Sequence, residues 1–247
     1  MNRIILSLLL VGTCTFVFAD SPITSTNFYE AFLHHKLVKE AKESGELTLA
    51  MAEFLSSTEK EDSVQLKMAV INALSWDIAG KKNAELYWSF LEKKYDYRTL
   101  PLDKLSGDEL LSLSYLKIMD DYNYAKEPLR LASMALKMEP ESYTYQMIRA
   151  LIKAQDVFLN GVYPHGWCKV YELVDEVENN EKLERDFKPE ATEIIFEYIN
   201  YYEEYCEEAP KTEENKKMKK ASSLDRKGLR PNKATIKTKP TKKSIDQ

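Results

Sequence analysis

Two cysteines, Cys168 and Cys206, are the residues whose type and spacing most directly predict chemistry in this chain. They are the only cysteines after residue 19. An even number of cysteines in an exported chain is typical of disulfide pairing. If the helices that carry them form an antiparallel hairpin turning near Leu183, the cysteines lie about 20 and 26 Å from the turn, at the same end. The sequence predicts a Cys168–Cys206 disulfide, with two buried free thiols as the alternative.

The three histidines, His34, His35 and His165, do not form a metal-binding pattern. His34 and His35 are adjacent on a predicted helix and point about 100° apart, so they cannot chelate one metal together. The chain contains no HExxH, GxGxxG, GxxxxGK[ST] or GxSxG motif. We therefore expect no metal, no cofactor and no catalytic residue.

Four tyrosines lie close together in the last predicted helix: Tyr198, Tyr201, Tyr202 and Tyr205. Aromatic side chains at this density can form a platform for a carbohydrate or peptide. They can equally form core and edge, with their hydroxyls reaching water. The sequence leaves both interpretations open.

The first 19 residues have the features of a secretory signal peptide. Arg3 supplies the positive end, an apolar run follows at 4–11, and Val17 and Ala19 occupy the small-residue cleavage positions. Lipid attachment at Cys14 is the alternative to cleavage after Ala19. We expect an exported protein, periplasmic or extracellular, with no transmembrane segment after cleavage.

Charge divides the rest of the chain into two parts. Residues 210–247 contain 13 Lys and Arg against 4 Asp and Glu, whereas residues 20–209 contain 36 acidic and 21 basic residues. The basic tail has few apolar residues and is predicted to be disordered. Contact between the tail and an anionic surface is open, but the expected export argues against nucleic acid as a partner.

Residues 20–209 are predicted to form a domain of about nine helices, because apolar residues recur there at helical spacing and only 7 Gly occur in the chain. Ser106 and Glu109 have the spacing of a capping box, and Pro128 falls in the first turn of a helix. The expected helices span 27–45, 48–56, 62–78, 83–95, 108–121, 128–138, 141–160, 168–179 and 189–209. No stretch alternates as a strand would, so the fold class is all-α.

The stretch from residue 110 to 159 resembles tetratricopeptide-like helical repeats. The residues that carry the resemblance are Leu113-Ser114, Asn123-Tyr124, Ala132, Ala135 and Pro140. In the first half of the domain, residues 65–76 resemble a HEAT-like repeat nearly as well. The resemblance implies an irregular α-solenoid of antiparallel helix pairs, with a concave surface for a protein or peptide. A compact helical bundle is the alternative.

The expected function is therefore that of an exported, non-enzymatic helical-repeat protein that binds a protein or peptide. Polar residues near the ends of the repeat helices are candidates for the partner surface: Lys117, Asp121, Tyr122, Arg149 and Lys153. Two alternatives stay open. One is a structural cell-envelope protein whose basic tail contacts an anionic surface, and the other is an enzyme on a helical scaffold.

Overall fold

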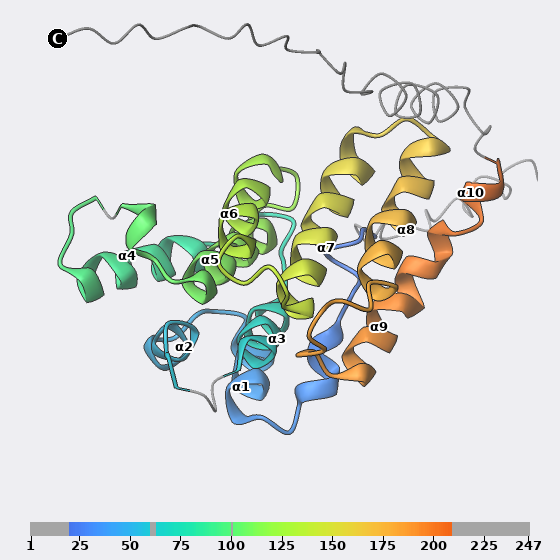
Figure 1. The fold of residues 1–247 in the computed structure, drawn as a ribbon. Coiled ribbons are helices and arrows are strands. Elements are labelled where there is room, and N and C mark those ends of the chain that lie inside the picture. Colours follow the sequence, from blue (N-terminus) through green and yellow to red (C-terminus); the bar gives the residue numbers. More distant parts are fainter. Residues whose placement is uncertain (1–19, 60–62, 100, 209–247) are drawn as a thin grey trace, which may run out of the picture. The chain divides into compact units, whose positions relative to one another are not determined.

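A computed structural model describes residues 20–59, 63–99 and 101–208 (Figure 1). The expected signal peptide and basic tail lie outside these residues. The described part contains ten α-helices, three 3-10 helices and no strand, which confirms the all-α prediction. The elements are η1 (Phe28–Phe32), α1 (Lys36–Ser44), α2 (Leu49–Leu55), α3 (Val64–Leu74), α4 (Asn83–Tyr95), η2 (Leu102–Lys104), α5 (Gly107–Asp120), α6 (Lys126–Leu136), α7 (Tyr143–Asn160), α8 (His165–Glu178), α9 (Pro189–Ile199), η3 (Asn200–Tyr202) and α10 (Tyr205–Glu208).

Helices α5 to α8 pack in the order in which they follow one another along the chain. Helix α5 packs on α6, α6 on α7, and α7 on α8, which lies beside it in Figure 1. Other contacts skip along the sequence, because α3 packs on α5 and α7, and η1 packs on α9. The first pattern is that of stacked helix pairs. The second pattern departs from a regular solenoid, in which each repeat contacts only its neighbours. The arrangement is consistent with a solenoid or a bundle.

Helix α5 is the most deeply buried long helix, with 12 of its 14 residues buried. It contacts α3, α4, α6 and α7. Two of its buried residues are serines, and Ser114 Oγ donates a 2.6 Å hydrogen bond to the Pro128 carbonyl of α6. A small side chain at this position lets the two helices approach closely while its hydroxyl remains paired.

The segment before η1 is buried, although most of its residues are polar. Ser21, Ile23, Thr24 and Thr26 are all at most 6% exposed. Side chains from α3, from the residues directly after it and from α7 satisfy the backbone of this segment. Asn72 Nδ2 of α3 donates to the Thr26 carbonyl, Trp76 Nε1 donates to the Thr24 carbonyl, and Gln155 Oε1 of α7 accepts from the Ile23 N–H. Burial of the polar segment is tolerated because these groups are paired.

Three predicted helices are shorter or more broken than expected. The first divides into η1 and α1, because His35 takes an extended conformation as the N-cap of α1. The helix expected to reach Ile78 ends at Leu74, where Ser75 has a φ of 60° that no right-handed helix accommodates. In place of the last predicted helix, α9 ends at Ile199 and is followed by the separate elements η3 and α10. Within the described residues, no helix is both long enough and apolar enough to cross a membrane.

Candidate functional site

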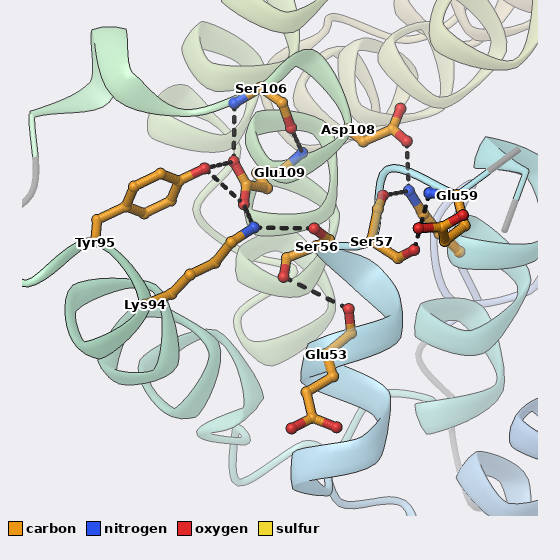
Figure 2. Close-up of polar contacts among 10 residues, drawn as sticks. Glu53, Ser56, Ser57, Glu59, Lys94, Tyr95, Ser106, Asp108 and Glu109 are labelled. Carbon is orange, nitrogen blue, oxygen red and sulfur yellow. Dashed lines mark hydrogen bonds and ion pairs between the residues drawn. The ribbon is translucent and has the colours of Figure 1, made fainter.

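The N-terminus of α5 carries two adjacent carboxylates, and its capping geometry holds one of them. Ser106 Oγ accepts from the Glu109 N–H at 3.2 Å, and Glu109 Oε2 accepts from the Ser106 N–H at 2.9 Å. This is the capping box that the spacing predicted. Figure 2 shows the reciprocal pair and the groups around it.

Glu109 turns inward, where it is 1% exposed and holds a lysine from α4. Lys94 Nζ lies 2.7 Å from Glu109 Oε1 and donates to the Ser56 carbonyl at 2.9 Å (Figure 2). Tyr95 Oη donates to Glu109 Oε2 at 2.8 Å. Burial, with the hydrogen bond and charge of Glu109, raises the pKa of Tyr95 to about 12, so the phenol stays protonated as a donor.

Asp108 holds a second lysine in the same way. Lys67 Nζ of α3 lies 2.6 Å from Asp108 Oδ2 and donates to the Ser57 carbonyl at 2.6 Å, with its side chain 1% exposed. Tyr145 Oη of α7 donates to Asp108 Oδ1 at 2.5 Å. Burial and the charge of Asp108 raise the pKa of Tyr145. Asp108 is thus a junction between α3, α5 and α7.

Both lysines join the C-terminal end of α2 to the N-terminal end of α5. The carbonyls of Ser56 and Ser57 follow directly after α2. A helix C-terminus carries partial negative charge and favours cations, whereas an N-terminus favours carboxylates. The ion pairs therefore complement the charges of both helix ends. Lys67 and Lys94 thus serve to hold α2 and α5 together.

An acidic cleft of about 500 Å³ opens next to Asp108. Six carboxylate residues line it: Glu59, Asp108, Glu139, Glu141, Glu184 and Asp186. The rest of the lining comprises Ser63, Val64, Pro140, Ser142 and Tyr145. Asp186 accepts from Ser142 Oγ at 2.5 Å and from the Thr144 N–H at 2.8 Å, so it caps α7. The four glutamates are exposed, and none of them pairs with a cation of the described chain. The cleft has a negative potential that attracts cations.

An apolar groove of about 480 Å³ lies between α4, η2, α5 and α6. Its lining comprises Ala84, Glu85, Trp88, Ser89, Leu102, Leu113, Lys117, Glu127 and Leu131. Trp88 is half-buried, and Leu113 and Leu131 are each 1% exposed. Lys117 Nζ and Glu127 Oε2 form a 3.2 Å ion pair that links α5 to α6 at this groove. A groove of this kind can accept an aliphatic or aromatic side chain, with charged groups at hand to orient it.

Of the five residues predicted for a partner surface, only Lys117 lines one of the two concavities, the apolar groove. Asp121 is exposed at the end of α5, where its Oδ1 accepts from the Asn123 N–H at 3.1 Å. This contact makes Asp121 part of the α5–α6 turn.

The other three predicted partner residues make contacts within the domain. Tyr122 lies edge-on to Trp76, with ring centroids 5.3 Å apart. Arg149 Nε donates to Ser133 Oγ of α6 at 3.1 Å, and Lys153 forms an i,i+3 ion pair within α7. Whether any of them meets a partner stays a prediction.

The structure joins Cys168 of α8 and Cys206 of α10 in a disulfide, with Cα atoms 4.6 Å apart. The tyrosines near it do not form one flat platform. Tyr202 is 5% exposed and Tyr201 is 70% exposed, and the rings of Tyr198 and Tyr202 meet at 72°. This is the arrangement of core and edge rather than of coplanar faces.

The histidines have no shared site. The His35 ring packs against Phe54 with centroids 5.4 Å apart, and His165 begins α8. Among the residues that the structure describes, no group of three or more His, Cys, Asp or Glu residues could hold a metal ion.

No protein-family model, curated protein or solved structure matches the chain. The tetratricopeptide-like or HEAT-like resemblance thus rests on the residues that suggested it and stays a prediction. Sequence reasoning missed both concavities as sites. Trp88 on α4 was the signal for the groove, and Glu139 and Glu141 in the EPES turn before α7 were the signal for the cleft.

Proposed function

We propose that this chain is an exported, non-enzymatic protein that binds a segment of a protein or peptide partner in the groove between α4, α5 and α6. The observation that carries the proposal is the groove's apolar lining, which includes the half-buried Trp88. A concave surface with an apolar lining and a few polar groups is the usual form of a ligand site. The proposed export rests on residues 1–19.

The partner segment we propose has one large apolar side chain with a basic residue beside it. Leu, Ile, Met or Phe fits the lining, and burial of such a side chain contributes about 1.5–3 kcal/mol. Glu85 lies exposed at the groove, and residues 20–209 carry 36 acidic against 21 basic residues. An adjacent Lys or Arg in the partner complements this charge, which favours its rate of association and its selection over acidic segments.

A peptide-display selection tests the proposal. A random twelve-residue library is selected against the full chain, and the binding of the enriched peptides is measured by isothermal titration calorimetry. We expect enriched peptides to share an apolar residue next to Lys or Arg. Trp88→Ala removes part of the groove and should weaken their binding at least about tenfold, equivalent to 1.4 kcal/mol.

Matched variants separate the groove from general effects on the surface. Leu86→Ala changes an exposed residue of the same helix that does not line the groove, so it should leave binding unchanged. Glu85→Lys should disfavour basic peptides, whereas Glu193→Lys on α9 should not. Equal binding to Trp88→Ala and to the unaltered chain would contradict the proposal.

A pull-down from an envelope extract, with and without residues 211–247, separates this function from a structural role of the basic tail. A partner retained without the tail supports the groove. Loss of the partner with the tail, together with release by salt, supports contact with an anionic surface instead.

A further inference from the structure

The disulfide lies at the edge of an aromatic cluster that α10 helps to cover. Trp167 is at the centre of this cluster, with Phe158 and Tyr202 at 6.0 Å, Tyr163 at 5.5 Å and Tyr205 at 4.8 Å between ring centroids. Of these rings, Tyr205 comes from α10, and it is the nearest to the indole. The position of α10 therefore decides whether Tyr205 covers its side of Trp167.

Helix α10 has little of its own to hold it in place. It contains four residues, and an isolated helix of this length is not stable in water. Glu203, Glu204 and Glu207 beside the disulfide are exposed. The contacts that hold α10 include the Cys168–Cys206 bond and the ring contacts of Tyr205 with Trp167 and with Tyr163, and the disulfide is the covalent one among them.

The two sulfurs differ in their surroundings. Cys168 is 7% exposed, and Cys206 is half-buried on α10. A thiol in solution therefore reaches the Cys206 sulfur more easily. Cys168 lies in the first turn of the 14-residue helix α8, where the helix dipole stabilises a departing thiolate. A better leaving thiolate speeds disulfide exchange.

We propose that the Cys168–Cys206 disulfide is a redox-sensitive clasp, whose reduction releases α10 from α8 and uncovers Trp167 while the rest of the helical domain stays folded. The reductant is a dithiol. Its first thiolate bonds to Cys206 Sγ, and the Sγ–Sγ bond breaks with the electron pair leaving on Cys168. Its second thiolate then displaces Cys206 and closes the reductant's own disulfide. Two electrons pass to the protein, and each cysteine thiolate takes up a proton.

Limited digestion with chymotrypsin tests the clasp, because this protease cuts after aromatic residues and residues 209–247 contain none. The full chain is digested with and without dithiothreitol, and the fragments are identified by mass. We expect reduction to speed cleavage after Tyr202 and Tyr205 at least about tenfold, because a covalent bond then no longer opposes local opening of this segment. Cleavage after Phe28 and Tyr115, which are buried far from the disulfide in sequence, should keep its rate.

The Cys168→Ser/Cys206→Ser variant should behave like the reduced chain and should not respond to dithiothreitol. If this variant does not fold, reduction of the folded chain still decides the question. Unchanged cleavage after Tyr202 and Tyr205 on reduction would overturn the proposal. So would simultaneous exposure of Phe28 and Tyr115, because the disulfide would then stabilise the whole fold rather than hold α10.

Discussion

Lys67 Nζ and Asp108 Oδ2 lie 2.6 Å apart, and this pair joins the buried interior of α3 to the wall of the acidic cleft. The lysine is 1% exposed, whereas the aspartate retains 29% exposure of its side chain. A fully buried ammonium is tolerated only when it is paired and hydrogen-bonded, as Lys67 is to Asp108 and to the Ser57 carbonyl.

Replacement of Lys67 by Met should lower the free energy of unfolding by about 3 kcal/mol, because Asp108 and the Ser57 carbonyl lose their partner. Urea denaturation followed by circular dichroism measures the change. Lys36→Met is the matched control, since Lys36 and Glu40 form an exposed pair with side chains 85% and 43% accessible. It should change stability by less than about 0.5 kcal/mol. Equal effects of the two substitutions would show that the Lys67 pair is not important for stability.

Gly107 should couple to Tyr145 across the α5–α7 contact. A Cβ at Gly107 would lie 2.8 Å from Tyr145 Oη, so Gly107→Ala must displace the hydroxyl that donates to Asp108. We expect a loss of about 1–2 kcal/mol in unfolding free energy from this overpacking. In a Tyr145→Phe background the same substitution should cost less, because the clashing oxygen is gone. A double-mutant cycle measures the difference, and additive effects would rule out the coupling.

Asp120 should make stability depend on pH. Burial raises its pKa above the usual value of 3.8, and the hydrogen bond from the Ala84 N–H only partly opposes this. Between 3.8 and the raised folded-state pKa, the folded chain binds more protons than the unfolded chain. Stability contributed at this site therefore falls as pH rises through that window.

Asp120→Asn should remove this component, since the amide oxygen can still accept from Ala84 and cannot ionise. Thermal unfolding of both proteins, measured from about pH 4 upward, compares the two slopes. We expect the stability of the variant to increase relative to that of the unaltered chain as pH rises. Parallel curves would show that Asp120 does not contribute to the pH dependence.

Ser106→Ala should cost about 1 kcal/mol, because Ser106 Oγ accepts from the Glu109 N–H at the start of α5. Ser63 is the N-cap of α3 but makes no capping hydrogen bond with its side chain. Ser63→Ala should therefore have little effect on chemical denaturation. Similar losses of unfolding free energy for both serines would show that the hydrogen bond from the Glu109 N–H to Ser106 Oγ does not stabilise the protein.

Helix ends with local signals were predicted well. Thr48 accepts from the Met51 N–H, Ser106 and Glu109 form their capping box, and α4 spans the predicted 83–95. Each of these depends on residues three or four apart, so neighbouring side chains decide it. The break at His35 between η1 and α1 has no comparable local signal.

The candidate sites were harder to predict because their residues are distant in the chain. The groove combines α4, η2, α5 and α6, and the cleft combines residues from Glu59 to Asp186. Lys117 was singled out for its place on a repeat helix, but nothing in the sequence placed it in the same groove as Trp88 of α4. Likewise, the burial of residues 21–26 depends on Asn72, Trp76 and Gln155.

The amino-acid sequence alone determined the all-α class, the capped helix ends and a pair of cysteines available for bonding after residue 19. These follow from periodicity, from contacts within one helical turn and from composition. Only the tertiary structure decided which apolar faces meet, where a groove is left open between them, and that α10 lies over Trp167. The physical reason is that burial is a property of surfaces brought together from distant segments, and a helical pattern specifies that a face is apolar without specifying what covers it.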